Sequence, residues 1–223
     1  DYDGIDLQLR ARFIRDEQDG LTQETVPGLG VYRIDLPDRV NRFVLQGRET
    51  VHFAGGSTIR VSLNRQDPHG ETRKDRVDSP VDETRTRRGT LQSAELVGTV
   101  ADGDRTWVVG ARGEIEHFEQ YLERLEILGG ELAETERQEV DRSSLGHGAG
   151  YAQLKWQLHE TVTVLGGARG EYHLRFGGVI APRLALAFRP SDEVTIRASG
   201  GRGFRVPAAR ELGFFFDHSA LGY

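Results

Sequence analysis

Cysteine is absent from the 223 residues of the chain, which excludes disulfide bonds, zinc–thiolate sites and a thiol nucleophile. Long apolar runs are absent as well, since none approaches the roughly 18 residues that a transmembrane helix needs. The net charge is −6, and this lack of a basic excess argues against nucleic acid as a partner. Only 37% of the residues are hydrophobic. A sheet with one apolar and one polar face fits that composition.

Apolar and polar residues alternate with a period of two along much of the chain. In "IDLQLRARF", residues 5–13, every second residue is apolar, and Asp, Gln and Arg lie between. "TIRVSLNR" and "VTIRAS" alternate in the same way. This period is typical of strands with one apolar face and one face rich in Arg, Glu and Thr. We expect about nine strands, near residues 5–15, 40–53, 58–67, 87–100, 105–118, 148–158, 161–173, 179–189 and 194–205.

Short turns alternate with long polar stretches between these strands, a layout typical of outer-membrane barrels. An odd number of strands in one meander would leave two unpaired edges, which lipid does not tolerate. We therefore predict an all-β fold: an antiparallel transmembrane β-barrel meander of about nine strands from a larger barrel, with long loops on one side and short turns on the other. The expected turns are 54–57, 101–104, 159–160 and 190–193, and the expected loops are 16–39, 68–86 and 119–147.

One segment of the third expected loop allows two interpretations. In "HFEQYLERLEILGG", residues 117–130, the apolar residues follow helical spacing. A short helix and a continuation of the preceding strand fit equally well, and Gly129-Gly130 would end either of them.

The closing stretch "RASGGRGFRVPAARELGFFFDHSALGY", residues 197–223, carries the most specific motif. It resembles a late-barrel signature of TonB-dependent outer-membrane receptors, in which a strand reading roughly R-x-S-x-G-x-G-F-R-x-P leads into an extracellular loop. Upstream, a Gln-x-x-Trp strand, a Gly-x-Arg strand and a Pro-Arg-Leu-Ala-Leu hairpin also look like this family. The resemblance is strong over residues 148–223. Over residues 1–147 it is weaker and rests on the alternation of strands and connections. The matching residues are Arg197, Ser199, Gly201, Gly203, Phe204, Arg205 and Pro207.

The resemblance implies a barrel of about 22 strands closed by an amino-terminal plug in the outer membrane of a Gram-negative-type bacterium. The family takes up scarce nutrients, such as ferric siderophores or cobalamin, with energy from the TonB complex. We find no plug, TonB box or terminal aromatic strand in this sequence. We therefore expect residues 1–223 to be a partial barrel domain whose parent contacts TonB through its plug. A passive porin-like channel is the alternative.

The candidate ligand-binding residues lie in and after the signature. Phe214, Phe215 and Phe216 could bind an aromatic or macrocyclic ligand by stacking, begin a strand or belong to an aromatic girdle. Arg202 and Arg205 are expected near the barrel mouth. The signature residues Gly201, Gly203, Phe204 and Pro207 are expected chiefly to shape the wall, because glycine permits close backbone approach and proline cannot donate to a ladder.

No pattern predicts catalysis, a cofactor or a metal site. The seven histidines are scattered and lack the spacing of metal ligands. There is no G-x-S-x-G motif, and the glycine pairs do not complete G-x-G-x-x-G before a helix. Arginines facing the lumen could attract anions, or they could pair with Glu114, Glu116 and Glu171. We predict that the chain is not an enzyme and that its partners are lipid, a metal chelate as cargo and the TonB complex.

Overall fold

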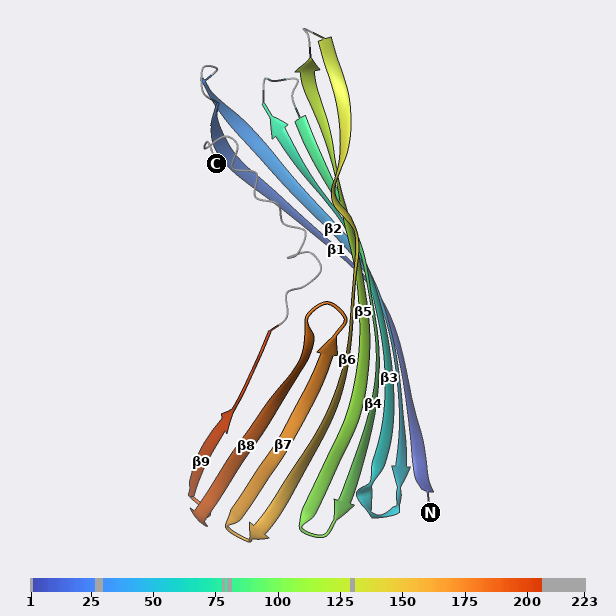
Figure 1. Cartoon of the computed structure of the whole chain (residues 1–223), viewed down its shortest axis with the longest axis vertical. Helices are drawn as coiled ribbons and strands as arrows, with labels where there is room; N and C mark the ends of the chain where they lie inside the picture. The colour runs from blue at the N-terminus through green and yellow to red at the C-terminus, as the bar shows by residue number, and fades with distance from the viewer. Residues whose placement is uncertain (1, 27–29, 78, 80–81, 129–130, 206–223) are drawn as a thin grey trace.

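The computed structural model describes residues 2–26, 30–77, 79, 82–128 and 131–205. These residues form one sheet of nine antiparallel strands, each hydrogen-bonded to the next in chain order (Figure 1). The predicted all-β antiparallel meander is therefore confirmed. The strands are β1 Tyr2–Val26, β2 Gly30–Phe53, β3 Thr58–Arg76, β4 Asp82–Asp102, β5 Arg105–Leu128, β6 Glu131–His159, β7 Val162–His173, β8 Gly177–Ser191 and β9 Val194–Gly201.

Tight connections gather at the lower end of the sheet in Figure 1, where the N-terminus also lies. Between β2 and β3 the chain makes a short 3-10 turn, Ala54–Gly56, in which Gly55 and Gly56 have φ of 81° and 80°. Between β4 and β5, Gly103 has φ of 57°. These left-handed conformations favour glycine, so the sequence determines where each hairpin closes.

The polar stretches that we expected to be loops are mostly strand. Residues 16–39 belong largely to β1 and β2, which stay paired from Tyr2↔Phe53 to Val26↔Gly30. Residues 68–86 and 119–147 likewise extend β3 to β6. Beyond the bilayer both faces of a hairpin can meet water, so ladder pairing continues without an apolar face. The polar composition of these stretches reflects their exposure to water on both faces and not the absence of strands. The loop interpretation was therefore wrong.

The segment 117–130 is strand as far as it is described, because β5 continues to Leu128. Tyr121 pairs with Thr86 of β4 on one side and with Gln138 of β6 on the other. A helix would leave both neighbouring ladders without a partner, so the strand interpretation is the right one. The ladder between β5 and β6 shifts register between Phe118 and Tyr121, which marks a bulge.

The sheet has few buried side chains, as expected for a single layer. Among the residues that the structure describes, the buried apolar ones are Ile34, Val44, Val97, Leu122, Val140 and Ala149. Large apolar side chains are instead exposed along one face, for example Leu9 at 76% and Leu184 at 61%. In the described part of the chain, no helix has the length and hydropathy needed for a membrane crossing.

Candidate lumen-wall site

In the lower part of the sheet, near the tight turns in Figure 1, one face is apolar from β1 to β9. Residues directly opposed in neighbouring strands share a face. One such row runs through all the strands from β1 to β8: Ile5, Val51, Ile59, Gly98, Val109, Ala152, Ala168 and Pro182. Ile5, Val109 and Ile196 are more than half exposed. Such a face suits lipid contact, which leaves the opposite, polar face to line the lumen.

The lipid-facing side ends near the tight turns in a tryptophan contact. Trp156 Nε1–H donates a hydrogen bond to Asp104 Oδ2 at 2.7 Å. The Arg105 guanidinium lies 4.7 Å from the centre of the Trp156 ring. An indole with one polar contact and one cation beside it is typical of the membrane–water interface.

On the lumen side, the first group of the site is built on Tyr151 of β6. Its hydroxyl donates to Glu95 Oε1 at 3.1 Å, and the Arg169 guanidinium lies 5.7 Å from the ring centre. Tyr151 pairs in register with Arg169 of β7 and with Gly110 of β5. A Cβ at Gly110 would lie 2.3 Å from Tyr151 Cζ, so the ring occupies the space that a side chain at residue 110 would need.

Two arginine–glutamate pairs lie beside this tyrosine. Arg112 Nη2 pairs with Glu114 two residues along β5, and Arg169 pairs with Glu171 two residues along β7. Residues two apart on a strand point to the same face, so both pairs are directed into the lumen. Pairing with Glu114 and Glu171 is therefore the observed state of these two arginines.

Two histidines complete the cluster. The rings of His147 and His173 stack with centroids 4.8 Å apart. His173 Nε2 lies 3.4 Å from Glu171 Oε2, and His147 Nδ1 lies 3.9 Å from Glu114 Oε1. Phe204 of the closing signature meets His173 edge to face at 6.3 Å. The signature and the lumen wall thus form one contiguous surface.

A hollow of about 650 Å³ opens beside Tyr151 on this surface. Small residues form much of its lining, and acidic, aromatic and basic side chains contribute to it as well. A concave surface of this kind, with a few placed polar groups, could hold a small polar ligand or a segment of chain. Residues that line it include Glu95, Tyr151, Gln153, Gly167, Arg169, Arg183, Ser199, Gly201, Arg202 and Gly203.

The structure brings part of the predicted signature to this hollow. Gly201 ends β9, and the Arg202 backbone N–H donates to the Pro182 carbonyl oxygen at 3.0 Å. Arg202 and Gly203 line the hollow, and Arg205 is exposed one residue beyond Phe204. Ligand contact by Arg202 and Arg205 stays a prediction. Pro207, Phe214, Phe215 and Phe216 lie outside the described residues.

Sequence reasoning missed the tyrosine and histidine groups of this surface. Period-two alternation already places Tyr151 and Arg169 on the polar faces of their strands. Their neighbours depend on register, which a single strand does not reveal. Within the residues that the structure describes, no three His, Asp or Glu side chains are arranged to hold a metal ion.

A meander with a lipid-facing side and a polar lumen side is part of the wall of an outer-membrane β-barrel. The family model described as "TonB dependent receptor-like, beta-barrel" matches residues 2–223. The chain belongs to this family, whose barrels lie in the outer membrane of Gram-negative bacteria. The family resemblance predicted from the closing signature is confirmed.

Among solved structures, the chain is similar to one titled "Copper transporter OprC", with 10% sequence identity and a TM-score of 0.44. The similarity covers 92% of this chain and 46% of that one, so the chain spans about half the length of that structure. A comparison with curated proteins finds no match.

Proposed function

We propose that this chain forms part of the barrel wall of a TonB-dependent active transporter for a scarce nutrient carried as a metal chelate. The observation that carries the proposal is the family match over residues 2–223. A ferric siderophore is the cargo that we put first, and cobalamin is second. The plug, the TonB box and the remaining strands belong, in this proposal, to other parts of the full-length protein.

The lumen wall supports a role in binding rather than in catalysis. Its hollow is bordered by Arg169, Arg183 and Arg202, and a channel lined with such groups focuses the field that acts on an anionic chelate. Arg169 is already paired with Glu171, whereas Arg183 and Arg202 stand on the side nearest β9. We therefore assign cargo contact in this wall to Arg183 and Arg202.

A growth test separates the two cargoes. The full-length gene is expressed in a host that lacks its own siderophore and cobalamin receptors. Growth is then measured under iron limitation with single siderophores, and separately under cobalamin dependence. Rescue by a ferric siderophore supports the first cargo, and rescue only by cobalamin supports the second. Failure of both in cells with a folded barrel in the outer membrane would overturn the cargo assignment.

A further inference from the structure

Three tall hairpins, β1–β2, β3–β4 and β5–β6, extend beyond the lower part of the sheet at the end opposite the tight turns (Figure 1). The β4–β5 ladder runs without a register shift from Asp82↔Leu125 to Asp102↔Arg105. Glu95 and Glu83 lie an even number of positions apart on β4, so both point to the same face, the lumen side of the wall. We call residues 16–39, 69–88 and 119–142, as far as they are described, the blade.

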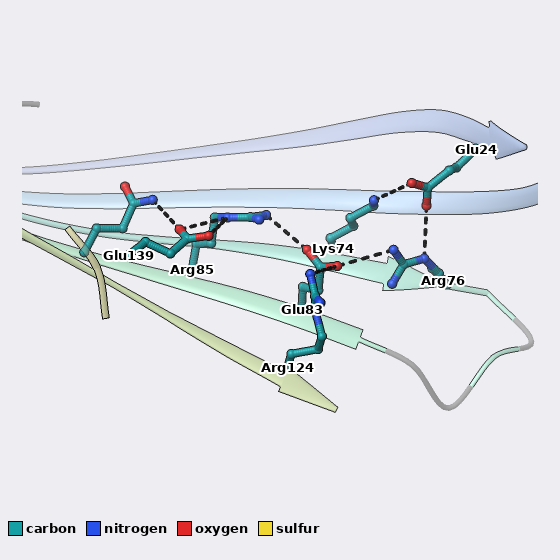
Figure 2. A network of polar contacts seen from close by, with 8 residues as sticks. Glu24, Lys74, Arg76, Glu83, Arg85, Arg124 and Glu139 are labelled. Atoms are coloured by element: carbon teal, nitrogen blue, oxygen red, sulfur yellow. Dashed lines mark hydrogen bonds and ion pairs between the residues drawn. The ribbon is translucent and has the colours of Figure 1, made fainter. Parts of the chain in front are cut away.

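Glu83 is the hub of an ion network on the blade, shown in Figure 2. Its side chain is only 7% exposed, yet three arginines reach it. Arg76 Nη2 and Arg124 Nη2 lie 3.4 Å and 3.2 Å from Oε1, and Arg85 Nη1 lies 3.2 Å from Oε2. Burial would raise the pKa of Glu83, but the arginines outweigh it, and the net shift is downward. The carboxylate is therefore held in its charged form.

The network reaches from Glu83 to the outer strands. Glu24 of β1 accepts from Lys74 at 2.9 Å and from Arg76 at 3.0 Å (Figure 2). Glu139 of β6 pairs with Arg85 at 3.2 Å. Arg76 and Arg85 thus each hold two carboxylates, and the chain of contacts joins all three hairpins. Bonds between non-adjacent strands add to the backbone ladders and resist splaying of the hairpins.

Three buried apolar residues lie among these ion pairs. Ile34 is 1% exposed, Leu122 5% and Val140 8%, although no second sheet or helix covers them in the part of the chain that is described. The long side chains of the network are suited to cover them, because arginine and lysine pack their stems on apolar surface. Each lies directly opposite a polar side chain of the network in the register. Ile34 is opposite Arg76 and Leu122 is opposite Arg85. Val140 is opposite Gln120, whose side-chain amide donates a hydrogen bond to Glu139 Oε2 at 2.6 Å.

Below the network, two backbone ladders are interrupted at the same level. Between β3 and β4, pairing stops at Gln66↔Leu91 and resumes at His69↔Arg88. Pro68, which lacks an N–H, lies in that gap. Between β5 and β6, the register shifts just after Phe118, which pairs with Gly89 of β4. The two interruptions therefore form one line across four strands, which we call the seam. Bulges and missing ladder bonds are where sheets bend.

We propose that the blade moves as one rigid unit on the membrane wall, with Glu83 as its central tie and the seam as its hinge. The β1–β2, β2–β3 and β4–β5 ladders cross this level unbroken, so the motion is a limited bend and not a detachment. The three hairpins then cannot open separately to admit cargo. The inference stands on the geometry of the blade and holds for any cargo.

Spin-label distance measurements test the proposal in the full-length protein in outer-membrane preparations. Residues 1–223 contain no cysteine, so within them a pair of introduced cysteines provides the only two thiols for labelling. One pair, Asp19→Cys with Glu123→Cys, lies within the blade on exposed positions of β1 and β5. The other, Gln92→Cys with Glu123→Cys, crosses the seam. We expect a narrow distance distribution within the blade and a broader one across the seam. If the two label pairs gave distance distributions of equal width in a protein with no other substitution, the proposal would be overturned.

Glu83→Gln tests the role of Glu83 as the central tie of the blade. The substitution removes the charge and keeps the shape of the side chain, so the spin-label distance distribution within the blade should broaden and lose its narrow peak. Glu17→Gln is the matched control, because Glu17 is an exposed blade carboxylate that pairs with Arg15 and Arg39 outside the network. The control should keep the narrow peak. An unchanged distribution in Glu83→Gln, or equal broadening in both variants, would contradict a tie at Glu83.

Discussion

Gly201 and Pro182 approach each other so closely across the β8–β9 ladder that a Cβ at residue 201 would lie 2.9 Å from the Pro182 carbonyl oxygen. That oxygen also accepts the Arg202 backbone N–H, so it has little freedom to move away. Glycine at this position of the signature is therefore a requirement of backbone packing.

Gly201→Ala should destabilise the barrel wall by about 1–3 kcal/mol, because the new methyl group meets backbone rather than a flexible side chain. The measurement is urea unfolding of the full-length protein in detergent, followed by tryptophan fluorescence. Gly203→Ala is the matched control, since a Cβ there meets nothing within 4 Å. Equal losses in both variants would show that the close approach is not the cause.

Gly110→Ala should act on the hollow and not on the fold. The added methyl group would displace the ring of Tyr151, whose far end can swing away at the loss of its hydrogen bond to Glu95. We expect normal amounts of folded barrel but a raised KM for uptake. Gly113→Ala, where a Cβ meets nothing within 4 Å, should leave uptake unchanged. An unchanged KM in Gly110→Ala would contradict a role for Tyr151 in cargo binding.

Arg202→Gln should weaken uptake of an anionic chelate. A hydrogen bond to a charged group contributes about 1.5–3 kcal/mol, so its loss should raise the KM roughly tenfold or more. Arg189→Gln serves as control, because Arg189 is exposed near the tight β8–β9 turn, away from the hollow. Equal KM values in the two variants would refute a role for Arg202.

The blade should loosen in acid. The pKa of Glu83 lies below the usual 4.5 for glutamate in the folded chain, as does that of Glu24, whose partial burial is outweighed by its bonds to Lys74 and Arg76. A lowered pKa gives stability that is complete above the ordinary pKa and is lost as pH falls through the folded value. A spin label at Glu123→Cys should therefore gain mobility as pH falls below about 4.5. Glu83→Gln should flatten that response, and an unaltered pH profile in this variant would contradict the assignment.

The isolated 223-residue chain should not form a stable monomer in water. Its apolar face is built for lipid, and in the described part the outer edges of β1 and β9 have no paired strand. Sedimentation in detergent-free buffer should show aggregates. A monodisperse monomer that melts cooperatively would contradict this expectation.

The sequence was sufficient to locate the parts of the strands that form the membrane wall, because alternation such as that from Ile5 to Phe13 indicates a two-faced sheet directly. It was not sufficient for the blade. There both faces are polar, so strands such as those around Glu24 and Glu83 had the composition of loops. The site shows the same limit. Tyr151, Gly110 and Arg169 come from three strands, and only the register brings them together.

Uptake by cells that express the full-length protein tests the central claim most directly. Initial rates for a radiolabelled ferric siderophore that supports growth are measured over a range of concentrations, in hosts with and without TonB. The account predicts saturable uptake that disappears without TonB, at equal amounts of folded barrel in the outer membrane. Uptake that rises linearly with concentration and persists without TonB would contradict it and identify a passive channel.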